Sequence, residues 1–199
     1  MLGFITIAIF LILAYVIGTA ATKFEKTKIA KAWLPLQPVI NGVVENNGSA
    51  VYMFAKEATN AASWLLGDYN GKKILASIYP NKRKYYFNRW DRYNYFSVAI
   101  LELEGKKDWK VIYQQPAQKG NSGFSIVADE DLKQRLLNAG VLNLVTAVNN
   151  AGVSYYSGSR LLQLSDTVIQ SWTPAPEKFK QELELLLKLA AINEQVNVT

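Results

Sequence analysis

The sequence predicts an α+β protein in which one N-terminal transmembrane helix is followed by a single domain, an antiparallel β-meander covered by C-terminal helices. Two observations lead to this fold class. The first 21 residues contain no charged side chain. Behind them, alternating and aromatic-rich segments come first and helically spaced apolar residues come later, an order typical of helices packed on one face of an antiparallel sheet.

The uncharged stretch, residues 1–21, is interpreted as a membrane anchor. A helix over residues 2–21 would be about 30 Å long, which is the hydrocarbon thickness of a typical bilayer. The alternative is a cleaved signal peptide, because Gly18, Thr19 and Ala20 resemble a small-residue cleavage site after the apolar core. The absence of a basic segment before this core favours the anchor. The apolar side chains assigned to the anchor are Leu2, Phe4, Ile7, Phe10, Leu13 and Ile17.

A basic juxtamembrane segment with a proline-containing neck is expected over residues 22–38. Lysines beside a hydrophobic segment tend to stay on the cytoplasmic side. The sequence therefore predicts a single-pass signal-anchor topology, with the N-terminus outside and the α+β globular domain, residues 39–199, in the cytoplasm. Pro35 and Pro38 end the helical segment, because proline lacks an amide donor and disfavours helix in the residue before it. The juxtamembrane lysines are Lys23, Lys26, Lys28 and Lys31.

Strands are expected through the first part of the domain. Residues 39–44 end at a turn cluster, and residues 68–71 are a strong hairpin signal. Residues 50–66 show no clean period. The later strands are expected over residues 74–79, 85–103, 109–114 and 124–127, with polar turns at residues 80–84 and 104–107. Consecutive strands joined by such turns predict a meander.

Helical patterns dominate after residue 128. Asp129 is the expected N-cap of a helix that ends at Gly140, because acids follow it in the first turn, where the helix dipole favours them. A short helix over residues 142–148 and a hairpin over residues 153–164 are expected next. The last helix is expected to begin at Thr173 and Pro174 and to cap the sheet. Its apolar face consists of Phe179, Leu183, Leu186, Leu187 and Ala190.

The sequence contains no recognisable catalytic, metal or cofactor motif. There is no cysteine and no histidine, which excludes thiol chemistry and the commonest general base and metal ligand. Residues 67–71 lack the lysine and hydroxyl residue of a nucleotide-binding loop. The acids at residues 129–131 are explained by helix capping. We therefore expect no cofactor and no metal, and no residue is assigned a catalytic role.

Basic and aromatic residues are concentrated between Lys72 and Arg92, with Asp91 as the one acid. Near an anionic leaflet each cation contributes about 1 kcal/mol, and tryptophan prefers the interface. Single-stranded nucleic acid is another possible ligand, although no nucleic-acid motif accompanies the segment. The structural alternative is cross-strand packing beside a charged bend. The candidates for binding an anionic surface are Lys72, Lys73, Lys82, Arg83, Lys84, Arg89, Trp90 and Arg92.

These features favour a single-pass membrane protein whose cytoplasmic domain acts as a scaffold or accessory subunit of a membrane complex. The expected partners are the lipid bilayer and a protein in the same membrane, and nucleic acid is not expected. One alternative is a domain on the outer side of the membrane that binds envelope components or a small ligand. A further alternative is an enzyme of unrecognised type that works without histidine or cysteine.

Overall fold

A computed structural model describes most of the domain and two residues of the predicted anchor. The described residues are 15, 19, 31–45, 63–80, 84–86, 89–91, 94–114, 123–148, 152–169 and 173–197. Tyr15 and Thr19 are helical and exposed. In the part of the chain that the structure describes, no helix is both long enough and apolar enough to cross a bilayer. The predicted anchor residues outside the described ranges are Leu2, Phe4, Ile7, Phe10, Leu13 and Ile17.

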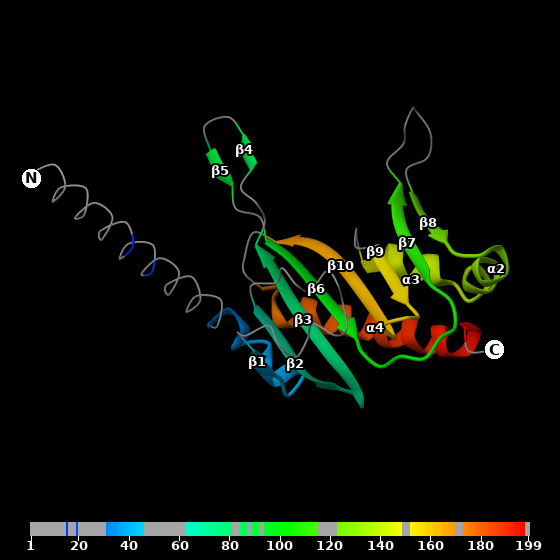
Figure 1. The fold of residues 1–199 in the computed structure, drawn as a ribbon, viewed down its shortest axis with the longest axis horizontal. Coiled ribbons are helices and arrows are strands. Elements are labelled where there is room, and N and C mark those ends of the chain that lie inside the picture. The colour runs from blue at the N-terminus through cyan, green and yellow to red at the C-terminus, as the bar shows by residue number, and fades with distance from the viewer. Residues whose placement is uncertain are drawn as a thin grey trace, which may run out of the picture.

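An eight-stranded antiparallel sheet forms the centre of the domain, and helix α4 lies across one of its faces (Figure 1). The strand order is β1-β2-β3-β6-β10-β9-β7-β8. These strands are β1 (Val43–Glu45), β2 (Ser63–Tyr69), β3 (Lys72–Pro80), β6 (Asn94–Ile100), β7 (Trp109–Gln114), β8 (Gly123–Val127), β9 (Gly152–Tyr156) and β10 (Leu161–Ile169). The helices that lie wholly within the described residues and have defined bounds are the short 3-10 helix η1 (Gln37–Val39), α2 (Glu130–Asn138), α3 (Val141–Val148) and α4 (Pro176–Asn197). The predicted α+β class, with an antiparallel sheet and a C-terminal helix, is confirmed.

The predicted meander is wrong at the step from β6 to β7. Strands β1, β2, β3 and β6 are successive neighbours, as a meander requires, and β7 pairs with β8. Between β6 and β7, however, the sheet contains β10 and β9. Residues 104–107, expected to form a tight turn, belong to a longer loop over residues 101–108. The sequence could not reveal this strand order. Side-chain alternation shows which residues lie on each face of a strand, but it does not show which strands pair with each other.

The long strand predicted over residues 85–103 is interrupted. Its later part is β6, whereas β4 (Lys84–Tyr86) and β5 (Arg89–Asp91) form a separate two-stranded sheet, which we call the ribbon. Pro80 at the end of β3 pairs with Asn94 at the start of β6. Strands β3 and β6 are therefore one hairpin into which the ribbon is inserted. Aromatic residues favour strands in general, and nothing local distinguishes one long strand from this arrangement.

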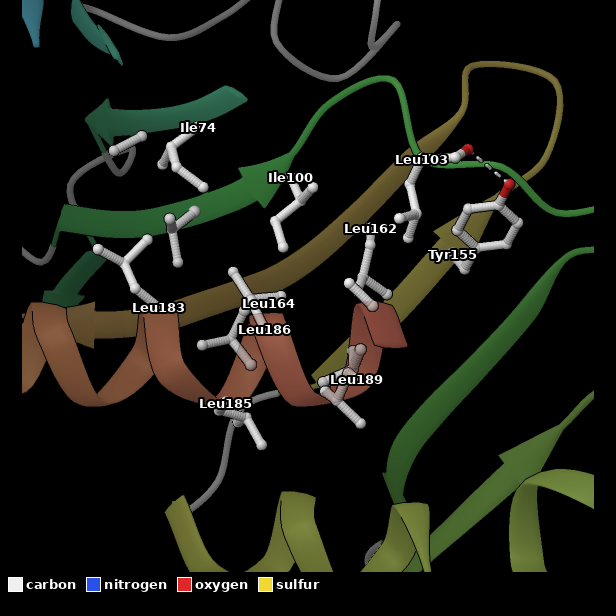
Figure 2. Close-up of a cluster of buried hydrophobic side chains, with 14 of the residues drawn as sticks. Ile74, Ile100, Leu103, Tyr155, Leu162, Leu164, Leu183, Leu185, Leu186 and Leu189 are labelled. Carbon is white, nitrogen blue, oxygen red and sulfur yellow. Dashed lines mark hydrogen bonds between the residues drawn. The ribbon is translucent and has the colours of Figure 1, made fainter. Parts of the chain in front are cut away.

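One face of the sheet carries an unbroken row of apolar residues, one from each strand. From β1 to β8 the row is Val44, Leu65, Ala76, Val98, Leu164, Val153, Val111 and Ile126. All of them are buried except Val44, which is half-buried. Figure 2 shows Leu186 of α4 beside Leu164 of β10, and both belong to the buried core. Burying each such side chain stabilises the fold by about 1.5–3 kcal/mol, so this row and α4 form the centre of the core.

Helix α4 is buried on more than the predicted side. The predicted apolar face is buried except for Leu187, which is half-buried. Leu185 is also buried, and it points away from the sheet, toward the neighbouring helices (Figure 2). Helix α4 contacts α2 and α3 as well as β6 and β10. It begins at Pro176 and not at the predicted Thr173. The Thr173 hydroxyl donates a 2.9 Å hydrogen bond to the carbonyl of Ala32.

Buried amides near the end of α4 hold the loop over residues 101–108. Asn193 Nδ2 donates to the Glu104 carbonyl at 2.7 Å, and Asn193 Oδ1 accepts from Trp109 Nε1 at 2.7 Å. Asn197 Nδ2 donates to the Lys107 carbonyl at 2.7 Å, and its Oδ1 accepts from the Lys107 amide at 3.0 Å. The two asparagines thus satisfy backbone groups of a loop that has no strand of its own to pair with.

Tyr155 supports the same loop from the sheet. Its hydroxyl donates to the carbonyls of Leu103 at 3.0 Å and Gly105 at 3.2 Å. Burial raises the pKa of Tyr155, which keeps the hydroxyl protonated and able to donate. A Cβ added to Gly105 would lie 2.7 Å from this hydroxyl, so the close approach of the loop requires glycine at this position.

Replacing Asn193 with alanine should destabilise the fold, because the Trp109 indole N–H and the Glu104 carbonyl would lose a buried partner. We expect the unfolding free energy of the full chain to fall by roughly 2–4 kcal/mol, measured by urea denaturation in mild detergent with tryptophan fluorescence. Asn143→Ala, at an exposed position of α3, is the matched control and should change it by less than about 0.5 kcal/mol. Equal stabilities of the two variants would contradict the role assigned to Asn193.

The predicted N-cap of α2 is confirmed. Asp129 Oδ1 accepts a 2.9 Å hydrogen bond from the amide of Leu132, and Lys107 Nζ lies 2.8 Å from Asp129 Oδ2. The hydrogen bond from Lys107, followed by that from Leu132, lowers the pKa of Asp129. The cap therefore also ties α2 to the loop over residues 101–108.

This lowered pKa predicts a pH dependence. A carboxylate with a lower pKa in the folded chain stabilises the fold above its unfolded pKa of about 3.9, and the contribution is lost as the pH falls through the folded value. The difference in urea midpoint between the natural chain and Asp129→Asn should therefore shrink as the pH is lowered below about 4. Glu177→Gln, in the first turn of α4, is the control. A difference for Asp129→Asn that stays constant with pH would refute the assignment.

Candidate functional site

The central sheet has two ends that carry different features. At the end where β3 finishes and β6 begins, Pro80 pairs with Asn94, and Ser63 of β2 pairs with the nearby Ile78. We call this the ribbon end. The opposite end, which we call the turn end, contains the β2–β3 turn at Asn70 and the β9–β10 turn at residues 157–160. Strand β3 has nine residues, so the two ends are about 26 Å apart.

The ribbon extends from the ribbon end, and neither of its strands pairs with the central sheet (Figure 1). Its register pairs Lys84 with Asp91, Tyr85 with Trp90 and Tyr86 with Arg89. The turn of the ribbon therefore lies between Tyr86 and Arg89. Lys84 lies in a strand at the base of the ribbon, whereas the sequence predicted a polar turn over residues 80–84.

The N-terminal segment joins the domain at the same end. Trp33 is fully buried, and its Nε1 donates a 2.9 Å hydrogen bond to the Ser63 hydroxyl at the start of β2. The Trp33 ring also packs on Phe96 of β6, with 6.2 Å between ring centroids. Lys31 is exposed immediately before this contact. The other juxtamembrane lysines, Lys23, Lys26 and Lys28, lie outside the described residues.

The structure divides the predicted basic set between the two ends of the sheet. Lys72 and Lys73 are at the turn end, whereas Lys84, Arg89 and Trp90 belong to the ribbon. The described members of the set do not form one continuous surface, because the length of β3 separates Lys72 and Lys73 from the ribbon. The remaining candidates, Lys82, Arg83 and Arg92, lie outside the described residues.

The basic residues at the turn end are paired with acids. Lys72 Nζ lies 2.7 Å from Glu194 of α4, and Lys73 Nζ lies 2.6 Å from Glu102. The Tyr69 hydroxyl donates to Glu184 at 2.7 Å, and this hydrogen bond raises the pKa of Tyr69. These contacts join the β2–β3 turn to α4 and to the loop over residues 101–108. They give Lys72 and Lys73 a structural role.

Sequence reasoning missed the polar residues inside the domain. Asn193 and Asn197 are buried four positions apart on α4. Their spacing on an apolar helix face was the sequence feature that could have indicated buried polar side chains. Glu182 of α4 is also buried, and no local pattern marked it. Among the described residues, no group of three or more acidic, histidine or cysteine side chains is placed to hold a metal ion.

The second face of the sheet is also buried in its central strands. Trp64, Leu75, Ala99, Leu101 and Leu161 form an apolar cluster there. A polar contact lies beside it, in which Gln163 Nε2 donates a 2.7 Å hydrogen bond to the buried Ser97 hydroxyl. Burial on both faces explains why β3 and β6 contain nearly continuous apolar runs and no clean alternation.

Comparison with known proteins does not assign a function. The sequence matches no model of a known protein family. No curated protein and no solved structure matches it either.

The contact between Trp33 and Ser63 should fix the N-terminal segment to the sheet. Ser63→Ala removes the acceptor of a buried indole N–H, which should cost roughly 1–3 kcal/mol. We expect faster hydrogen exchange in residues 31–40 of the full chain, measured by mass spectrometry. Ser159→Ala, in the β9–β10 turn, is the control and should leave this exchange unchanged. If Ser63→Ala leaves it unchanged as well, the contact does not hold the segment.

Proposed function

We propose that this chain is a membrane-tethered scaffold or accessory subunit, held by a single N-terminal span with the ribbon end of its domain toward the bilayer. One observation carries the proposal. The segment that follows the uncharged residues 1–21 joins the domain beside Ser63, at the same end of the sheet from which the ribbon extends.

The neck supports this orientation because it is part of the domain core. Trp33, Leu36 and Ile40 are fully buried. The carbonyl of Ile40 also accepts a 2.7 Å hydrogen bond from the Asp68 amide of β2. A flexible linker would let the domain rotate freely, whereas a packed neck transmits the direction of the preceding segment to the sheet. The proline-containing neck predicted from the sequence is therefore a fixed attachment over residues 31–42.

The charge pattern supports a tether on the same side. Lysines follow the uncharged stretch at residues 23, 26, 28 and 31, with Glu25 as the one acid among residues 22–31. Basic residues close to a span favour the cytoplasmic side. The proposed topology therefore has the N-terminus outside and the domain in the cytoplasm, where a partner subunit would meet it beside the membrane.

The tether is tested with the full chain in cells. We expect the chain to remain in the membrane fraction after alkaline carbonate washing and to need detergent for release. Recovery of the intact chain in the aqueous fraction would refute the tether. A reporter fused after Thr199 should be active in the cytoplasm. Activity on the outer side only would instead support the alternative of an external domain that binds envelope components or a small ligand.

The accessory role is tested in the same preparation. In mild detergent, a subunit of a complex should co-purify with one partner at a fixed stoichiometry, measured by quantitative mass spectrometry. Charge changes at exposed residues of the turn end, such as Gly158→Lys, provide a control surface that should not affect this stoichiometry. A chain that purifies as a clean monomer would count against the role of accessory subunit.

A further inference from the structure

The ribbon is an isolated element with no ladder to the rest of the fold. It has two strands of three residues each, and a two-stranded hairpin of this kind is at best marginally stable in water. It receives no additional strand from the eight-stranded sheet. An external surface that contacts the ribbon would supply the stabilisation that the sheet does not.

The residue types of the ribbon indicate which surface this is. Its two strands contain two cations, Lys84 and Arg89, three aromatic residues and one acid, Asp91. The register places Asp91 opposite Lys84, and it places Arg89 opposite Tyr86 and not opposite an acid. At the turn end, Lys72 and Lys73 each have an acidic partner. The ribbon strands combine two cations and three aromatic residues with a single acid.

We propose that the ribbon binds the anionic phospholipid headgroups of the bilayer that holds the chain, an inference that rests on the proposed tether. Lysine and arginine are attracted to anionic leaflets, and tyrosine and tryptophan prefer the interface. Two cations give weak binding alone. The tether compensates for this weakness, because it fixes the ribbon end close to the lipid surface at a high effective concentration. Contact at both the neck and the ribbon then holds the domain in one orientation.

The test uses single labelled cysteines in the full chain, which has no cysteine of its own. Tyr86→Cys places a fluorophore on the ribbon. Gly158→Cys places one in the β9–β10 turn at the turn end, where an added Cβ meets nothing within 4 Å. The chain is reconstituted into vesicles of phosphatidylcholine alone or with phosphatidylglycerol, each with a headgroup-linked quencher. We expect quenching at position 86 in the anionic vesicles and little at position 158.

Charge variants test the chemistry of the contact. Lys84→Gln with Arg89→Gln should lower the equilibrium constant for lipid contact, measured by quenching at position 86, by about 30-fold. Raised salt should lower the same constant in the chain with the natural charges. Lys84→Arg with Arg89→Lys keeps both charges and should restore the contact if the ribbon folds. Lys72→Gln with Lys73→Gln removes the same charge at the turn end and should leave the quenching unchanged.

The outcomes separate this inference from the tether. If the chain floats with both kinds of vesicle but position 86 is not quenched, or is quenched equally without anionic lipid, the ribbon proposal is overturned and the tether stands. A chain that does not float with vesicles overturns both. Single-stranded RNA can be added to the anionic vesicles at equal ionic strength. If it relieves the quenching at position 86, nucleic acid competes with lipid for the ribbon. A response to RNA in the absence of any response to anionic lipid would overturn the proposal in favour of nucleic acid.

Discussion

The loop over residues 101–108 has to carry the chain from β6 past two intervening strands before β7 can begin. Such a crossing leaves backbone groups without a neighbouring strand, and an unpaired buried backbone group costs about 1–3 kcal/mol. Side chains from two distant elements provide hydrogen-bond partners for these backbone groups. Asn193 and Asn197 of α4 bond the loop from the helix layer, and the hydroxyl of Tyr155 bonds it from the sheet. The strand order of the sheet depends on these contacts.

The apolar row across all strands makes this order consistent with a single core. Residues that are distant in the chain, such as Val44 on β1 and Ile126 on β8, belong to the same row because each strand pairs in the register that keeps one face apolar. A slip of one residue in any strand would turn its apolar set to the other face. Helix α4 lies across this row and is also apolar toward α2 and α3, so it is held between the sheet and the other helices.

The difference between the two ends of the sheet gives the domain a direction. At the turn end, ion pairs and hydrogen bonds join the sheet to α4. One example is the ion pair between Lys72 and Glu194. At the ribbon end, Trp33 attaches the N-terminal segment to the sheet, and the ribbon extends from this same end. Lysines with close acidic partners, such as Lys72 and Lys73, add little to a long-range field. The scaffold role that we propose would use this fixed direction.

The sequence by itself determined the α+β class, the capped start of α2 at Asp129, the hairpin over β9 and β10 and the amphipathic α4, because these depend on local spacing and on single capping residues. The position of β9 and β10 between β6 and β7 was decided only by tertiary structure, since pairing partners are selected by long-range packing. The same holds for the separation of Lys72 and Lys73 from the ribbon: neighbours in sequence lie at opposite ends of one extended strand, and only the pairing of Pro80 with Asn94 shows where that strand stops.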